Sequence, residues 1–227
     1  MYFDIYYLIL VVPAIILSLW AQTRVTSTFE KYSKYSSQRR VTGMEAARKI
    51  LDANGLYNIR VERISGKLTD HYDPKNNVIR LSESVYASDS IAAMGVAAHE
   101  AGHAVQHSEK YVPIKIRNTI LPVANIGSHL AVPLAILGFF LGYEPLVSFG
   151  ILLFGAVVLF QLVTLPVEFN ASNRAVKILS SSGMIYENEE KGVKKVLGAA
   201  ALTYVAAALT SLMNLIRLIL VFGRRND

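Results

Sequence analysis

Residues 119–165 read TILPVANIGSHLAVPLAILGFFLGYEPLVSFGILLFGAVVLFQLVTL, two apolar runs joined by a short link. The runs, 119–141 and 146–165, are long enough at about 1.5 Å per residue to cross the ~30 Å apolar core of a bilayer. The link holds one acid and no base, whereas three basic residues precede the pair: Lys110, Lys115 and Arg117. Because basic residues mark cytoplasmic loops, the pattern predicts a transmembrane hairpin with its tip outside. A buried hairpin of a soluble protein is the alternative.

The composition of the whole chain agrees with a membrane protein. The 227 residues are 52% hydrophobic and 18% charged, with a net charge of +6, whereas soluble proteins are about 25% charged. This apolar content excludes an intrinsically disordered chain. The lack of cysteine excludes a disulfide framework, a cysteine-ligated zinc finger and a cysteine nucleophile. The positive charges lie beside apolar segments and form no basic motif, so we expect no nucleic-acid partner.

A third apolar segment, residues 5–20, precedes a group of basic residues: Arg24, Lys31, Lys34, Arg39 and Arg40. This order predicts an anchor whose N-terminus lies outside and whose following chain lies in the cytoplasm. A cleavable signal peptide fits poorly, because no Lys or Arg precedes the apolar run.

A fourth apolar segment, residues 196–222, is ambiguous. Asn214 and Arg217 interrupt it, and a charge at the bilayer centre is costly. The segment crosses the membrane with Arg217 reaching toward the surface, turns back, or packs on the polar part of the chain.

Residues 42–118 are more polar and predict a folded domain. Thr42 and Glu45 form a capping box at the start of a helix. Runs of strand-forming residues separated by turn residues predict a small antiparallel sheet, with strands near 60–64, 67–72 and 78–82. Ser88 or Asp89 then caps a second helix.

That second helix carries the strongest chemical signal, His99-Glu100-Ala101-Gly102-His103. Residues four apart share one face of a helix, so both imidazoles reach one ion, and the glutamate lies near a metal-bound water. Zinc with three protein ligands keeps a fourth position open for catalysis. The plainer alternative is a pair of hydrogen-bonded core histidines. We predict a catalytic zinc ion bound by His99 and His103.

The third ligand must come from elsewhere, because His107 lies about 12 Å along the helix axis from His99. Glu168 is the first acid after the hairpin, and a hairpin returns the chain to the membrane face that it left. This topology brings Glu168 beside the two histidines and makes it the expected ligand. An acid that stabilises the first turn of a helix is the alternative.

These segments resemble a known family. AAHEAGHAVQH at 97–107, LPVEFNASNRA at 165–175 and DHYDPKNNVIRLSESVYASDSIAAMGVAAHE at 70–100 are similar to the bacterial membrane neutral zinc metallopeptidases of the YugP type. The resemblance implies a zinc endopeptidase of the glutamate-ligand zincins (gluzincins), with ligands His99, His103 and Glu168 and with Glu100 catalytic. The chain also resembles HtpX-type membrane proteases, in which an acid often stands where this sequence has Ser172.

The expected mechanism is hydrolysis of a peptide bond. Glu100 acts as general base on a zinc-bound water and then protonates the leaving amine. Ser172, Asn173 and Arg174 are candidates to support a ligand or stabilise the transition state, although a surface ion pair is the plainer interpretation of Arg174. His129 is an ionisable residue inside the hairpin, which indicates either a functional group or a polar contact between helices.

Substrate binding is expected at the segment just before the motif helix, Val78, Ile79, Arg80 and Leu81. If this segment lies at a sheet edge above the zinc, its unpaired backbone groups can hold an extended peptide by strand addition.

The sequence therefore predicts a mainly helical α+β membrane protein with three or four transmembrane helices and a zincin-like catalytic domain. We expect five parts: an anchor at 1–21, catalytic segments at 22–118 and 166–195, the hairpin at 119–165, and an apolar helix at 196–227. The predicted location is the cytoplasmic membrane, with the catalytic domain facing the cytoplasm. The expected partners are Zn²⁺, the bilayer, and peptide or protein substrates that include membrane or misfolded proteins.

Two other functions remain open at this point. One is an intramembrane protease of the site-2 type, although the later apolar segments lack the buried aspartate ligand that this chemistry requires. The other is a non-catalytic membrane scaffold with a structural metal ion, against which three protein ligands argue.

Overall fold

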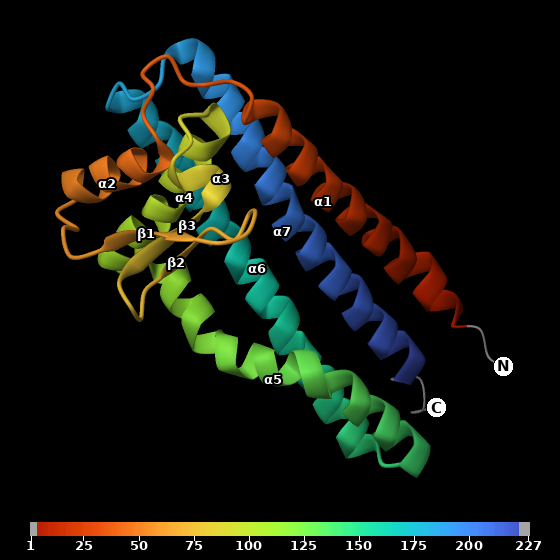
Figure 1. Cartoon of the computed structure of the whole chain (residues 1–227). Coiled ribbons are helices and arrows are strands. Elements are labelled where there is room, and N and C mark those ends of the chain that lie inside the picture. The colour runs from red at the N-terminus through yellow and green to blue at the C-terminus, as the bar shows by residue number, and fades with distance from the viewer. Residues whose placement is uncertain (1–3, 223–227) are drawn as a thin grey trace. The chain divides into compact units, whose positions relative to one another are not determined.

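The structure is a computed structural model that describes residues 4–222. In this range the chain consists mainly of helices, with one small three-stranded sheet (Figure 1). The elements are η1 (Tyr7–Val11), α1 (Val12–Tyr32), α2 (Gly43–Ala53), β1 (Arg60–Ile64), β2 (His71–Asp73), β3 (Val78–Ser82), α3 (Glu83–Tyr86), α4 (Ile91–Ser108), α5 (Val112–Leu141), α6 (Glu144–Ser181) and α7 (Glu187–Phe222).

The chain divides into two compact units. The helical unit comprises, within the described range, residues 4–22, 112–166 and 202–222. The sheet unit comprises residues 23–111 and 167–201. The predicted anchor begins in residues 1–3, and the predicted C-terminal segment ends in residues 223–227. Both of these ranges lie outside the described residues.

Within residues 4–222, four helical segments are long and apolar enough to cross a membrane: Tyr7–Tyr32, α5, α6 and α7. The predicted hairpin is confirmed as two helices, α5 and α6, joined at Gly142, whose φ of +64° favours glycine. The ambiguous segment 196–222 belongs to α7, which runs without interruption to Phe222. The possibility that this segment turns back is therefore wrong.

Small residues let the two hairpin helices approach closely. A Cβ atom added at Gly138 would lie 2.7 Å from the backbone nitrogen of Val147, and one at Gly150 would lie 2.6 Å from the carbonyl oxygen of Ala131. Helices in membranes associate through such close backbone contacts, because lipid offers no hydrophobic drive between them. The glycines therefore fix the pairing of α5 with α6.

Arg217 is accommodated by an ion pair within the helical unit. Its Nε donates to Oδ2 of Asp4 at 2.6 Å, and its guanidinium lies 5.2 Å from the ring centre of Tyr7. Further along the same two segments, the hydroxyls of Ser18 and Thr210 lie 3.0 Å apart. These acidic and aromatic partners reduce the free-energy cost of placing a charged side chain in the largely apolar helix α7.

Helix α2, in the sheet unit, begins as its sequence predicts. Thr42 accepts a hydrogen bond from the backbone of Glu45, whose carboxylate accepts one from the backbone of Thr42. The cap of α4 differs from the prediction: Ser90, one or two residues after the predicted caps, accepts a hydrogen bond from the backbone of Ala93. Ser90 suits this position because its hydroxyl satisfies an otherwise unpaired amide of the first turn.

The sheet is mixed, with one parallel and one antiparallel pair of strands. The prediction of an all-antiparallel sheet is therefore wrong. The strand order is β1-β3-β2, with β1 parallel and β2 antiparallel to β3. The burial of side chains explains the order. Val78, Ile79 and Leu81 of β3 are fully buried, as expected of a central strand, whereas the charged and less buried β1 tolerates an edge.

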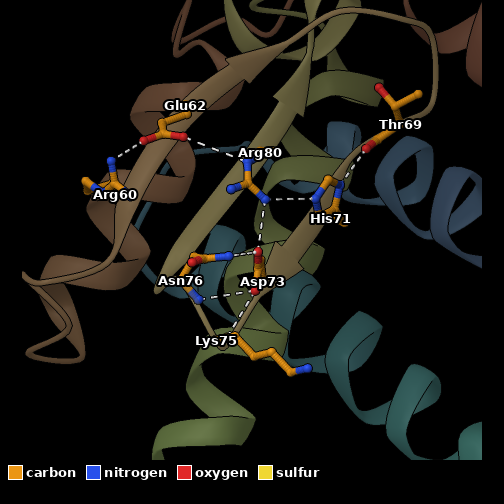
Figure 2. A network of polar contacts seen from close by, with 8 residues as sticks. All are labelled: Arg60, Glu62, Thr69, His71, Asp73, Lys75, Asn76 and Arg80. Atoms are coloured by element: carbon orange, nitrogen blue, oxygen red, sulfur yellow. Dashed lines mark hydrogen bonds and ion pairs between the residues drawn. The ribbon is translucent and has the colours of Figure 1, made fainter.

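The expectation that residues 78–81 form a free sheet edge is therefore also wrong. Both neighbouring strands pair with β3, and its one charged residue, Arg80, is engaged as well (Figure 2). Arg80 Nη1 donates to Oδ2 of Asp73 at 3.0 Å, and its Nε lies 3.8 Å from Oε2 of Glu62. Hydrogen bonds from Asn76 and Arg80 hold the pKa of Asp73 well below its ordinary value.

Helix α4 lies in the middle of the core of the sheet unit. It packs against α2 and the sheet, and its inward faces consist largely of small, fully buried residues: Ala92, Ala93, Ala97, Ala98, Ala101 and Ala104. Small side chains allow neighbouring elements to pack close to the helix backbone. The motif helix is therefore held rigidly on several sides.

Candidate metal centre

Two segments of the sheet unit bring the predicted ligands together. His99 and His103 lie one turn apart on α4, and their ring centres are 4.6 Å apart. Glu168, on α6, places its Oε2 at 3.3 Å from Nε2 of His99 and 3.4 Å from Nε2 of His103. The side chains are 13%, 13% and 5% exposed.

This geometry fits a zinc ion. Zinc binds histidine nitrogen and carboxylate oxygen at about 2.0–2.2 Å in a tetrahedron, which places two donor atoms about 3.4 Å apart. The two nitrogen–oxygen separations match that spacing, and all three donor atoms lie within 4.8 Å of one another. Among residues 4–222, this is the one group of three or more His, Asp or Glu side chains so arranged.

Gly102 allows α4 and α6 to meet at this point. A Cβ atom at residue 102 would lie 2.9 Å from the carbonyl oxygen of Ala171, a backbone atom that cannot turn away. Ala171 lies one turn after Glu168 on α6. The glycine between the two histidines therefore sets the helix separation that lets a carboxylate of α6 reach imidazoles of α4.

Each histidine has a partner for its second ring nitrogen. Nδ1 of His99 lies 3.1 Å from Oγ of Ser172, and Nδ1 of His103 lies 3.0 Å from Oε1 of Gln106. These contacts leave both Nε2 atoms directed at Glu168. Hydrogen bonds of this kind orient metal-binding histidines and select the tautomer.

Two further acids interact near the site, Glu100 with His103 and Asp70 with Glu100. Glu100 is buried on α4. Burial favours the neutral form of His103, but the hydrogen bond to Glu168 and the charges of Glu100 and Glu168 outweigh it, so the pKa of His103 is raised. Burial also raises the pKa of Asp70, against hydrogen bonds from Ser82 and with support from the charge of Glu100.

The remaining predicted site residues have other surroundings. Asn173 is exposed. Arg174 forms the ion pair of the plainer interpretation, with Glu109 at 2.8 Å, and also donates from Nε to Asn170. His129 lies on α5 in the helical unit, outside the unit that holds the metal-binding group.

The sheet edge next to α4 is β2. Strand β2 contacts α4, whereas the opposite edge, β1, contacts α2 and α3. The rings of Tyr72 on β2 and His107 on α4 meet edge to face at 6.1 Å. An extended peptide that adds to the sheet beside the motif helix would therefore pair with β2 and not with β3.

Comparison with known proteins agrees with these observations. Residues 7–223 match the family described as "Putative neutral zinc metallopeptidase". The chain belongs to this family. It is also 55% identical over 221 residues to the "Putative membrane protease YugP" of Bacillus subtilis (strain 168), covering 97% of this chain and 98% of that protein. The resemblance noted in the sequence is thereby confirmed, and no solved structure matches the chain.

Proposed function

We propose that the chain is a membrane-bound zinc endopeptidase of the gluzincin type, in which His99, His103 and Glu168 hold the metal and Glu100 is the general base. The observation that carries the proposal is the set of three donor atoms at zinc-like spacing, two from half-buried histidines of α4 and one from a buried glutamate of α6. Membership of a zinc metallopeptidase family supports the choice of metal.

The proposed reaction is hydrolysis of a peptide bond by water. When bound, zinc supplies Lewis acidity, which lowers the pKa of water and polarises the carbonyl group of the substrate. Glu100 accepts the proton of the attacking water and passes it to the leaving amine. His99, His103 and Glu168 offer three ligands, which leaves room for water and substrate at the fourth position.

The two alternative functions are less well supported. An intramembrane protease requires its motif helix within the bilayer, but α4 is not among the four helices apolar and long enough to span one. Its neighbours are α2 and a sheet with charged residues. A structural metal site is normally closed by four protein ligands, whereas the group on α4 and α6 offers three.

The orientation follows from the basic residues. Five of them follow the apolar part of α1: Arg24, Lys31, Lys34, Arg39 and Arg40. We therefore place the sheet unit on the cytoplasmic side of the cell membrane. Substrates there would be peptides or proteins, including membrane or misfolded proteins.

Removal and return of zinc tests the proposed function. The full chain in detergent is incubated with a denatured protein before chelation, after chelation, and after addition of one equivalent of zinc. We expect cleavage to disappear with the metal and to return at one zinc per chain. Cleavage that persists in samples shown to contain no metal would contradict the proposal.

A further inference from the structure

We propose that Gln106 is a positioning residue that fixes the tautomer of His103 and so keeps the Nε2 lone pair of this histidine available to the metal. The inference rests on the proposed function.

Gln106 is buried with no exposed surface, so water cannot replace its partners. Its Nε2 donates to the carbonyl oxygen of Val167 at 2.8 Å and to Oδ1 of Asn170 at 2.9 Å. Both of these atoms only accept hydrogen bonds. The amino group of Gln106 must therefore face α6, which leaves its oxygen, Oε1, for His103.

Asn170 is itself held in one orientation. Its Oδ1 also accepts a hydrogen bond from Nε of Arg174 at 2.7 Å, and a guanidinium can only donate. A turned amide would place the Asn170 amino group against two donors. Glu109 in turn holds the guanidinium through an ion pair at 2.8 Å. The guanidinium of Arg174, which can only donate, thus determines the orientation of the Asn170 amide. The Asn170 oxygen in turn supports the orientation of the Gln106 amide.

The consequence for His103 is a fixed tautomer. Because Oε1 of Gln106 accepts, Nδ1 of His103 must carry the proton, and the neutral ring has its lone pair on Nε2. Without Gln106, the carboxylate 3.4 Å from Nε2 would draw the proton to that nitrogen and block the metal-binding position.

His99 differs in this respect. Its partner is the hydroxyl of Ser172, which can donate or accept, so the contact orients the ring without selecting a tautomer. The two ligand histidines are therefore supported unequally, and loss of Gln106 should cost more metal affinity than loss of the Ser172 hydroxyl.

The test uses Gln106→Met, which keeps the volume of the side chain and removes its hydrogen bonds. Zinc affinity is measured by competition with a chromophoric chelator, in full-length protein without substrate. We expect the dissociation constant to rise about 10–100-fold, the effect typical of such supporting partners, and to rise less in Ser172→Ala. Lys177→Met, which removes an exposed cation on α6, serves as the matched control and should bind zinc as the wild type does.

A second readout reports the tautomer. Imidazole ¹⁵N shifts are recorded after chelation, at a pH where His103 is neutral. We expect protonated Nδ1 in the wild type and a substantial population of protonated Nε2 in Gln106→Met. Affinity within twofold of the wild type together with unchanged shifts overturns the inference. If Gln106→Met does not fold, Asn170→Ala is judged by the same two readouts, with a smaller shift in the same direction expected.

The outcomes separate this inference from the proposed function. A wild-type chain that binds no zinc would count against the function, while the ¹⁵N shifts would still show whether Gln106 sets the proton. A wild type that binds zinc and a Gln106→Met variant that binds it equally well, with unchanged ¹⁵N shifts, would count against the inference alone.

Discussion

Glu168→Ala is expected to release zinc from the protein. The carboxylate supplies one of three donor atoms, and its Oε2 lies within 3.4 Å of both ligand nitrogens. Because alanine offers no donor, we expect zinc affinity to fall by more than the 10–100-fold typical of a lost supporting hydrogen bond. Cleavage should disappear at zinc concentrations that saturate the wild type. Competition with a chelator measures the affinity directly.

The matched control for this change is Glu187→Ala, an exposed acid of the same unit at the start of α7. It should leave zinc binding unchanged. The assignment of Glu168 as a ligand fails if Glu168→Ala binds zinc as tightly as the control. The plainer role considered from the sequence, an acid that stabilises the first turn of a helix, is wrong, because α6 begins at Glu144 and Glu168 lies in its interior.

Glu100→Gln is expected to abolish most of the catalysis while keeping the metal. Glutamine has nearly the same shape as glutamate but cannot accept a proton, and general-base catalysis contributes about 10²–10⁴-fold to a rate. We therefore expect kcat to fall by about that factor, with zinc still bound at one ion per chain. Turnover of a fluorogenic peptide gives kcat, and metal analysis of the same sample gives zinc content.

Glu83→Gln provides the comparison for Glu100→Gln. Glu83 is an exposed acid that pairs with Arg63, and exposed pairs of this kind contribute little to stability. Its activity should remain near that of the wild type. Wild-type turnover by zinc-loaded Glu100→Gln would remove Glu100 from the mechanism and require another base.

The candidate metal-binding group could be predicted because the spacing of its histidines and the expected path of the chain are visible in the sequence. Residues four apart on a helix share a face, which placed His99 and His103 together. A transmembrane hairpin would return the chain to the membrane face that it left, which predicted Glu168 beside them. The structure brings all three donor atoms within 4.8 Å of one another.

The supporting residues were harder to predict. Gln106 and Asn170 became apparent only in the structure, because their roles depend on how α4 faces α6. One sequence signal was present: a polar, uncharged residue on the largely apolar motif helix, three positions after a ligand. Such a residue is buried only when its hydrogen bonds are satisfied.

The sheet shows why topology is difficult to predict from short segments. The strands occur near the predicted positions, but β1 and β2, which follow each other in the sequence, are not neighbours in the sheet. Strand β3 lies between them. Turn residues indicate where a strand ends and do not show which neighbour it pairs with. The burial of Val78, Ile79 and Leu81 marks β3 as the central strand.

X-ray absorption spectroscopy of the zinc-loaded wild-type protein tests the central claim most directly, because it counts the ligands at the metal. We expect one zinc ion per chain with four nitrogen or oxygen neighbours at about 2.0–2.1 Å, of which two are imidazoles. A third imidazole, or a purified chain that takes up no zinc, would contradict the metal centre built from His99, His103 and Glu168.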